Sequence, residues 1–369
     1  MFLKVEGSQQ NIAVQLRGVV KNFGRLEAVK AIDLNVEQGS LVTLLGPSGC
    51  GKTTILRMIA GLEHPTAGDI YIKGRLVNDI PIHRRNLGMI FQNYALFPHK
   101  TIFDNVAFGL KYRNVSKTDI REKVRKALEM VRLPDVGHRY PSQLSGGQQQ
   151  RIALARAIVI EPDVLLMDEP LSALDENLRE DMRREIDNLQ QMLGVTTIFV
   201  THDQREALSM SDKIVVMNDG FLQQEGPPED VYNFPSNRFV ADFLGSSNFF
   251  PGTVLNGENG QHRVRLESGH EFVSSHPSQW KEGDKIELVI RAQKFYVYAE
   301  KNAPEDNHGN PFRGVIKDRS YMGGEVSYFI DLEGGLSIHV ISIVNIRALK
   351  IGDSVIVDVS PRHCGLLPG

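Results

Sequence analysis

Short apolar runs alternate with segments of helical spacing up to about residue 245. Residues 41–45, 164–167 and 197–200 are apolar runs with the length of buried strands. From Ser116 to Arg132, apolar side chains recur three or four positions apart, which predicts a helix with one buried face. This alternation predicts an α/β fold with a parallel sheet. The long, mostly helical stretch between the first two strands predicts an inserted helical subdomain at about residues 93–160.

The pattern changes near residue 245. Beyond it, β-branched residues alternate or cluster in four runs that are separated by glycine-containing turns and by no comparable helical segment, at 254–266, 285–297, 312–330 and 354–359. We therefore expect two domains. Residues 1–245 form the α/β domain, and residues 246–369 form a small all-β domain of the barrel class.

Composition and charge narrow the class of protein. A chain of 369 residues with 41% hydrophobic and 24% charged residues can bury a core in each of two or three domains. The net charge of -3 argues against a surface that coats nucleic acid. Two cysteines are too few for a disulfide framework and fit a reducing compartment. No apolar run reaches the length of a membrane span, and the first ten residues lack the pattern of a secretory signal.

Residues 46–53, Gly-Pro-Ser-Gly-Cys-Gly-Lys-Thr, fit the phosphate-binding loop pattern G-x-x-x-x-G-K-[ST]. The motif follows a predicted strand and opens a predicted helix, which is the context that it requires. Glycines let backbone N–H groups surround phosphate oxygens, a lysine supplies a charge for the β- and γ-phosphates, and a threonine hydroxyl can bind Mg²⁺. The nucleotide-binding residues predicted here are Gly46, Ser48, Gly49, Cys50, Gly51, Lys52, Thr53 and Thr54.

The position of Cys50 at the same helix N-terminus predicts a thiol of raised reactivity. Its positive potential favours a thiolate, so Cys50 is expected to react with maleimides faster than a typical buried thiol.

Two acids follow the predicted strand at residues 164–167. An apolar run that ends in Asp-Glu is common by itself, but a phosphate loop in the same chain gives the pair a role. Asp168 is placed to hold Mg²⁺ through water. Glu169 is placed to hold and deprotonate the attacking water as a general base.

A second phosphate-facing helix start is predicted at residues 144–148, Leu-Ser-Gly-Gly-Gln. Ser145 can cap the helix that follows, and the two glycines leave its first turn bare. One nucleotide needs one phosphate loop, so a second cradle is surplus in a monomer. We therefore expect this segment to serve a nucleotide that is bound by a second copy of the chain.

Together these residues resemble the ATPase subunits of ATP-binding cassette (ABC) transporters, a family within the P-loop NTPases. The resemblance covers essentially the whole chain and implies that residues 144–148 are the family signature. It also implies roles for single residues. Gln92 is similar to the Q-loop glutamine that senses Mg²⁺ and the attacking water, and His202 to the switch histidine that contacts the γ-phosphate. The further nucleotide-contacting residues that it implies are Phe23 on adenine, Ser145, Gly146, Gly147 and Gln148 in the signature, and Asp175 in the D-loop at 172–175.

Within the family, the linker at 231–240 and the β-rich tail resemble importer ATPases for maltose, polyamines and ferric iron. The resemblance implies a C-terminal OB-like (TOBE) regulatory domain. One departure concerns regulation, because Arg-Ala-Gln stands at 291–293 where that subgroup often has Arg-Pro-Glu. The junction at 246–252 is more similar to the polyamine and iron types, and a polyamine-like solute is our best prediction.

This resemblance implies a bacterial transport motor that hydrolyses ATP with Mg²⁺. Two copies sandwich two ATP molecules, and two membrane permease subunits bind the aromatic-rich segment from Tyr94 to Phe108. An extracytoplasmic solute-binding protein is an indirect partner, and nucleic acid is not one. The expected location is the cytoplasmic face of the inner membrane, as a peripheral subunit.

Other members of the family remain as alternatives. A DNA-repair ATPase would place long heptad arms between Lys52 and Ser145, where none is found. A translation factor would carry two cassettes, whereas this sequence has one phosphate loop and one signature. An exporter subunit stays open, although the β-rich tail favours an importer.

Overall fold

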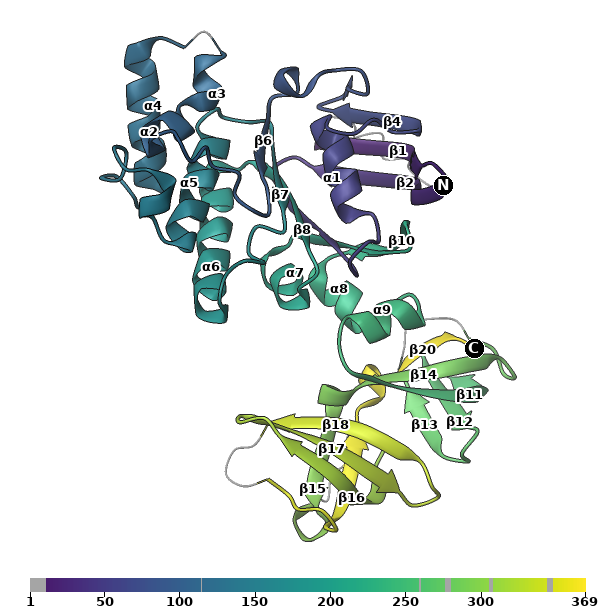
Figure 1. Cartoon of the computed structure of the whole chain (residues 1–369). Helices are drawn as coiled ribbons and strands as arrows, with labels where there is room; N and C mark the ends of the chain where they lie inside the picture. Colours follow the sequence, from purple (N-terminus) through teal and green to yellow (C-terminus); the bar gives the residue numbers. More distant parts are fainter. Residues whose placement is uncertain (1–10, 114, 259, 276–279, 305–307, 344–347) are drawn as a thin grey trace. The chain divides into compact units, whose positions relative to one another are not determined.

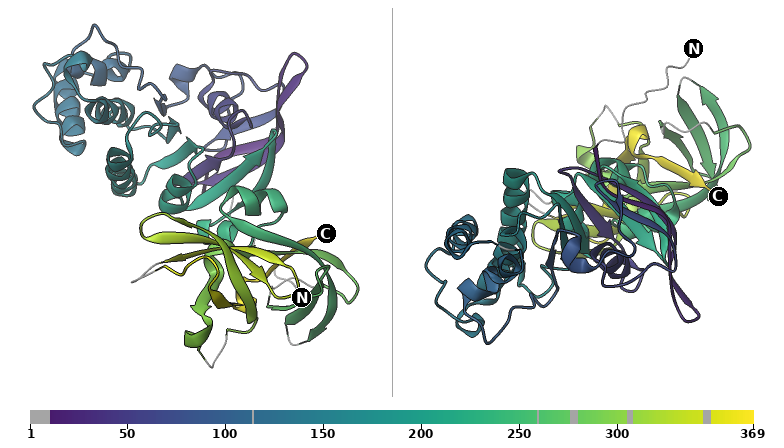
Figure 2. Two further views of the ribbon diagram at one scale, coloured as in Figure 1. Left: turned by 60° about the horizontal axis from the view of Figure 1, so that its bottom comes forward. Right: turned by 90° about the horizontal axis from the view of Figure 1, so that it is seen from above.

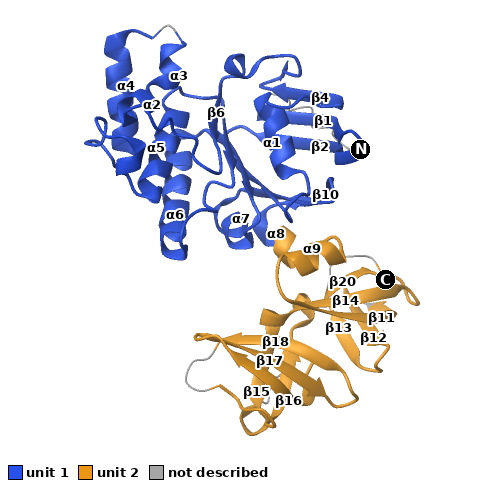
Figure 3. Cartoon of the chain, viewed as in Figure 1, with its two compact units in different colours: residues 1–229 blue, residues 230–369 orange. Residues whose placement is uncertain are grey.

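The computed structural model describes residues 11–369, except 114, 259, 276–279, 305–307 and 344–347. The chain forms two compact units, Met1–Glu229 and Asp230–Gly369 (Figures 1 and 3). Residues 1–10, on which the expectation about a secretory signal depends, lie outside the described residues. No helix of the described ranges has the length and hydrophobicity that a membrane span requires.

A six-stranded sheet, in the order β10-β9-β3-β8-β7-β6, forms the centre of the first unit. Neighbouring strands are parallel except for the antiparallel pair of β9 and β10. Its strands are β3 (Leu41–Leu45), β6 (Leu87–Ile90), β7 (Val164–Asp168), β8 (Thr196–Thr201), β9 (Lys213–Asn218) and β10 (Phe221–Gly226). The three predicted apolar runs therefore form β3, β7 and β8, side by side in a parallel sheet.

Both faces of this sheet are buried, which explains why its strands are apolar throughout. Alternate side chains of β7 enter different cores, with Leu166 on one side and Leu165 and Met167 on the other. The core that contains Leu166 is called the first core. It also includes side chains of α1 (Lys52–Ala60) and of a four-stranded antiparallel sheet in the order β2-β1-β4-β5. Those strands are β1 (Ile12–Phe23), β2 (Leu26–Glu37), β4 (Ala67–Ile72) and β5 (Arg75–Leu76).

Helices cover the other face and lie as a group beside the sheet in both views of Figure 2. The helices between residues 102 and 158 fall within the range predicted for an inserted helical subdomain, and that subdomain stays a prediction. The predicted helix at 116–132 is α4. The side chain of Ser116 caps its N-terminus, and the side chains of its apolar face are buried. The helices are α2 (Ile102–Val106), α3 (Phe108–Lys111), α4 (Lys117–Met130), α5 (Gly146–Ile158), α6 (Glu176–Leu193) and α7 (Gln204–Met210), with 3-10 turns η2 (Ile82–Arg84) and η3 (Pro141–Gln143).

The second unit contains two five-stranded antiparallel sheets, in the orders β13-β12-β11-β14-β20 and β15-β19-β16-β17-β18. Their inward side chains share one core. The strands are β11 (Ser247–Glu258), β12 (Gln261–Leu266), β13 (Glu271–Ser274), β14 (Lys285–Arg291), β15 (Phe295–Ala299), β16 (Phe312–Tyr321), β17 (Glu325–Leu332), β18 (Ser337–Ile343), β19 (Ser354–Val359) and β20 (Gly365–Pro368). The expected all-β character of the tail is thus confirmed.

Two short helices precede these sheets, α8 (Pro228–Asn233) and α9 (Arg238–Phe243). Ala241 of α9 packs against Val289 and Leu367 of the sheet. The division of the chain at 229/230 therefore groups α9 with the β-rich part. The boundary expected near residue 245 stays a prediction, which a pair of truncations can test. The 3-10 turns of this unit are η4 (Ala292–Lys294), η5 (Glu300–Asn302) and η6 (Pro361–His363).

Candidate nucleotide-binding site

The predicted functional residues follow the carboxyl ends of neighbouring parallel strands. The phosphate loop follows β3, Gln92 lies beyond β6, Glu169 directly follows β7, and His202 directly follows β8. Strand register brings these ends to the same edge, since Leu45 pairs with Thr201 and Asp168 pairs with Val200. Ligands of open α/β sheets bind at this edge. The topology therefore assembles residues that are far apart in the chain.

The phosphate loop requires its glycines. Gly49 and Gly51 have φ of +82° and +104°, which side chains rarely adopt. A Cβ on Gly51 would lie 2.6 Å from the carbonyl oxygen of Ala28, and one on Gly46 would lie 2.3 Å from that of Met217. Both neighbours are backbone atoms, so they cannot move aside. The loop therefore stays bare of side chains at three positions, as a phosphate cradle needs.

Lys52 opens α1 and is buried, with its ammonium fixed against the loop. Its Nζ donates to the carbonyl oxygens of Gly46, at 2.7 Å, and Pro47, at 2.8 Å. A positive charge is thus held beside the loop at a helix N-terminus, where the backbone potential also attracts anions. Ser48 and Gly49 at the tip of the loop are exposed, and Thr54 in the first turn of α1 is half-buried.

The expectation of a reactive thiolate at Cys50 is wrong. The side chain is only 4% exposed, and burial raises the pKa of its thiol. The charge of Lys52, whose Nζ is 3.7 Å from Sγ, acts in the opposite direction but is outweighed. Desolvation disfavours the charged form of a buried group. The sequence pattern indicated the local potential, whereas the burial comes from packing against the first core.

Thr53 and Asp168 lie together beneath the loop. The Thr53 hydroxyl donates to Oδ1 of Asp168 at 2.8 Å. Burial raises the pKa of Asp168, and the Thr53 hydrogen bond and the charge of Arg57 oppose this shift. A hydroxyl and a carboxylate are the oxygen donors that suit Mg²⁺, so this pair fits the predicted metal-holding role.

The side chains of His202 and Gln92 both approach the carboxylate of Glu169. Its Oε2 lies 3.3 Å from Nδ1 of His202 and 3.5 Å from Nε2 of Gln92. The Gln92 amide also donates to the hydroxyl of Ser172 at 3.3 Å. Glu169 has a φ of +44°, a strained value for a residue with a side chain. Its amide donates to the carbonyl oxygen of Val200, so β8 fixes this conformation. The arrangement places a carboxylate where it can accept a proton.

The signature and D-loop residues begin two neighbouring helices. Ser145 and Gln148 form a capping box at the start of α5, and Asp175 caps α6 by accepting from the amide of Leu178. Gly147 packs closely on Leu178, since a Cβ added to Gly147 would lie 3.0 Å from the Leu178 side chain. Gly146 faces open space. In the described ranges, no hydrogen bond or ion pair joins this group to the phosphate loop. The two segments that are predicted to bind phosphate are therefore separate within one chain.

Phe23 ends β1 and is 46% exposed. The ammonium of Lys21 lies 4.7 Å from the centre of its ring. Strand β2, which pairs with β1, supplies the Ala28 carbonyl beside Gly51. The predicted adenine-stacking residue is therefore on the hairpin that borders the loop.

Arg156 is a further residue of this region that was not predicted from the sequence. Tyr94 and Ala95 follow Gln92 and have φ of +60° and +46°. The Arg156 guanidinium donates to both of their carbonyl oxygens at 2.7 Å. This charged group on α5 holds the segment after Gln92 in its strained conformation. The available signal was an arginine within an otherwise largely buried helix.

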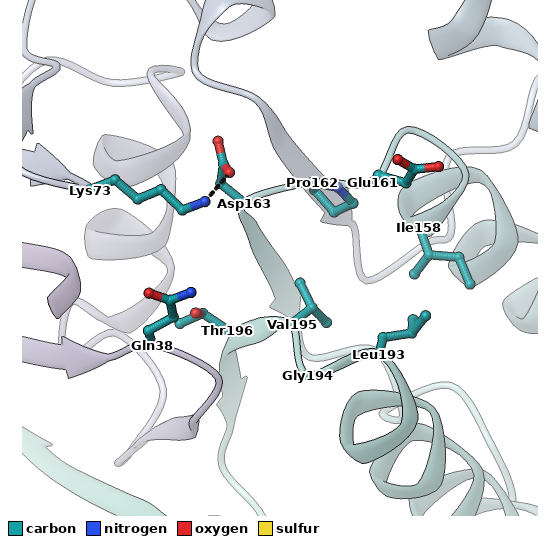
Figure 4. A pocket seen from close by; sticks show the side chains of 10 residues that line it. All are labelled: Gln38, Lys73, Ile158, Glu161, Pro162, Asp163, Leu193, Gly194, Val195 and Thr196. Atoms are coloured by element: carbon teal, nitrogen blue, oxygen red, sulfur yellow. Dashed lines mark hydrogen bonds and ion pairs between the residues drawn. The ribbon is translucent and has the colours of Figure 1, made fainter. Parts of the chain in front are cut away.

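Another cavity of the first unit lies at the opposite ends of the strands (Figure 4). It is lined by residues that precede β7 and begin β8, and the ion pair of Lys73 with Asp163 spans its wall. The cavity and the phosphate loop lie at opposite ends of the strands, so this cavity is not part of the candidate site.

Comparison with known proteins identifies the family. The ABC transporter family pattern matches residues 29–172, and the TOBE domain pattern matches residues 288–367. The spermidine/putrescine import ATP-binding protein PotA of Oleidesulfovibrio alaskensis is 46% identical over 326 residues, which cover 88% of this chain and 87% of that protein. The chain belongs to the ATP-binding subunits of ABC importers.

Other importer ATPases show similar likeness. The Fe(3+) ions import ATP-binding protein FbpC of Brucella abortus is 46% identical over 88% of this chain and 89% of that protein. The PotA protein of Rubrobacter xylanophilus is 43% identical over 97% of this chain and 94% of its own length. A dimeric structure of MJ0796, a bacterial ABC transporter cassette, is 34% identical with a TM-score of 0.53, and it covers 58% of this chain and 98% of the cassette. This importer ATPase therefore binds ATP and couples its hydrolysis to transport.

Proposed function

We propose that this importer ATPase works as a dimer with two composite ATP sites and drives the uptake of a polyamine-like solute. The convergence of Gln92 and His202 on Glu169, beside the phosphate loop, carries the catalytic part of the proposal. The substrate of the chemical step is ATP with water.

Each residue of the first half-site has a role in this proposal. Lys52 and the loop amides bind the phosphates, and Thr53, Asp168 and Gln92 would hold Mg²⁺. When bound there, Mg²⁺ neutralises charge on the phosphate oxygens. Glu169 orients the attacking water and takes its proton as the water oxygen bonds to the γ-phosphorus in line. The bond from the γ-phosphorus to the bridging oxygen breaks at the same time, and ADP leaves. His202 faces the same carboxylate and contacts the γ-phosphate.

The second half-site supports a dimer. Ser145, Gly146 and Gln148 leave a capped helix start accessible, and Asp175 is exposed beside it. Joined with the phosphate loop of a second copy, they would complete an ATP site. In a twofold dimer the same surface of each copy faces the other copy, so each chain would complete the ATP site of its partner. The likeness to the dimeric MJ0796 cassette supports this arrangement.

The proposed partners bind the segment from Tyr94 to Phe108. Rings of Phe97 and Phe108 lie 4.6 Å apart and are both partly exposed, next to the exposed Tyr112. Partly exposed aromatic groups of this kind mark protein contact sites. We propose that two permease subunits dock here, with an extracytoplasmic solute-binding protein as an indirect partner. The ATPase would then be peripheral, on the cytoplasmic face of the inner membrane, and would have no nucleic-acid partner.

Polyamine is the proposed solute, and ferric iron is the second candidate. The names of similar proteins support both, since PotA and FbpC relatives each reach 46% identity. Binding assays with putrescine, spermidine and Fe³⁺ on the solute-binding protein of the same transporter would distinguish the two.

Glu169→Gln tests the catalytic assignment. The amide cannot take the proton, so ATP turnover should fall by roughly 10²–10⁴-fold while ATP binding is retained. Glu161→Gln is the matched control, because Glu161 is an exposed glutamate that also has a left-handed φ, of +49°. Turnover by Glu169→Gln close to that of the control would show that Glu169 is not the base.

A further inference from the structure

The second unit contains a cavity with a strongly basic wall. Its volume is about 290 Å³. The lining comes from the end of α8, the turn η4 and the turn η6, namely Asn233, Phe234, Arg291, Lys294, Arg362 and His363. No acid is among these residues. Two segments that are far apart in the sequence, around η4 and η6, therefore bring cations together beside the neutral end of α8.

Arg291 is the most deeply placed of these cations, with 6% of its surface exposed. Its guanidinium donates to the carbonyl oxygens of Tyr232, at 2.9 Å, and Gly245, at 3.1 Å. It also donates to the Ala241 carbonyl and stacks on the Tyr232 ring. These partners are neutral, so they fix the guanidinium without cancelling its charge. Asp242 is the acid whose charge reaches Arg291, and it does not line the cavity.

The other cations are not neutralised either. Within the described ranges, neither Lys294 nor Arg362 forms an ion pair. Nδ1 of His363 is buried and has no hydrogen-bond partner there. Burial lowers the pKa of His363, and the charges of Lys294 and Arg362 lower it further. Both charges therefore act on the same imidazole, which shows that the positive potential converges on this space.

We propose that this cavity binds a small multivalent anion with phosphate or carboxylate groups. Guanidinium groups match such oxyanions through paired N–H donors, and an ammonium adds a movable charge. The volume is at the lower end of the range for small-molecule sites, about 300–1,000 Å³. Neutral lining residues, Asn233 and Phe234, supply an amide and an apolar wall.

The position of the cavity gives the anion a means of regulation. Arg291 joins the cavity to the carbonyl groups of residues 232–245, the segment that begins the second unit. An anion that binds N–H groups of Arg291 not used by these carbonyl groups would hold the guanidinium in place and so tighten this segment. The inference does not depend on the catalytic assignments, because none of these residues belongs to the nucleotide site.

Calorimetric titration of the full-length protein tests the proposal. Saturating Mg·ADP fills the phosphate loop first, so that added anions cannot bind there. Inorganic phosphate, pyrophosphate and citrate are then titrated separately, which distinguishes phosphate from carboxylate ligands. The double variant Lys294→Gln/Arg362→Gln should bind the preferred anion roughly tenfold or more weakly, because two charge-assisted contacts are lost. Lys301→Gln/Lys350→Gln removes the same charge outside the cavity and should bind as the wild type does.

Hydrogen exchange gives the location. Binding of the preferred anion should slow exchange of backbone amides in residues 232–245 of the wild type but not of the double variant. If the double variant fails to fold, the single variant Arg362→Gln replaces it, since Arg362 is exposed. Absence of binding by all three anions would overturn the proposal. So would an equal loss of affinity in the control, because that result would indicate a general charge effect.

Discussion

Arg85 stabilises the helix that carries the phosphate loop. It is 4% exposed, and its guanidinium donates to four carbonyl oxygens. Two of these, on Met58 and Ile59, belong to the last turn of α1 and lie 2.8 Å away. A cation at a helix C-terminus also interacts favourably with the helix dipole. Arg85→Met keeps much of the side-chain volume but leaves these carbonyls without their donor.

The expected loss is about 3–5 kcal/mol, because several carbonyl oxygens lose their charged donor and each buried acceptor left unsatisfied costs about 1–3 kcal/mol. For a domain of about 150–250 residues, each kcal/mol shifts the melting temperature by about 2–4 °C. Arg85→Met should therefore lower the melting temperature of the first unit by about 6–20 °C. Arg84→Met is the matched control, because Arg84 is an exposed arginine next to Arg85 and its replacement should shift melting by less than about 2 °C.

Two optical signals separate the units in this assay. Far-UV circular dichroism at helical wavelengths follows mainly the first unit, which contains all six helices α2 to α7 together with α1. Fluorescence follows the second unit, because the single tryptophan of the chain is Trp280. The dichroism transition should move in Arg85→Met, and the fluorescence transition should move less. Melting of Arg85→Met within 2 °C of Arg84→Met would refute the reasoning.

Three further predictions follow from the site and the domain boundary. Neither cysteine should react with a thiol reagent in the native protein at neutral pH, since burial raises the pKa of both; a native count near two thiols would contradict this. Mixing Ser145→Arg chains with Lys52→Ala chains should restore part of the ATPase activity that each lacks alone, through one intact composite site, and activity strictly proportional to concentration would argue for a monomer. A chain truncated after Gly245 should still bind ATP; higher solubility of a chain that ends at Glu229 would place the boundary in the first turn of α8, before α9.

The chemistry of the first unit was readable in the sequence because it depends on short segments. The backbone of the phosphate loop is determined by glycines within eight residues, and a strand, loop and helix follow one another directly. Strands buried on both faces have continuous apolar runs, so β3, β7 and β8 were visible from composition alone. The long antiparallel pair of β1 and β2 was not identified, because its half-exposed pattern gave no comparable apolar run.

The tertiary structure decided what depends on burial and on distant neighbours. Cys50 has the sequence context of a reactive thiol, yet packing removes it from water and raises its pKa. Arg156 gained its role from a strained segment some 60 positions away in the chain. The basic cavity joins α8, η4 and η6, and no local pattern marks those residues as neighbours. Short-range backbone geometry is encoded by adjacent residues, whereas desolvation and charge convergence arise only when the folded chain brings separate segments together.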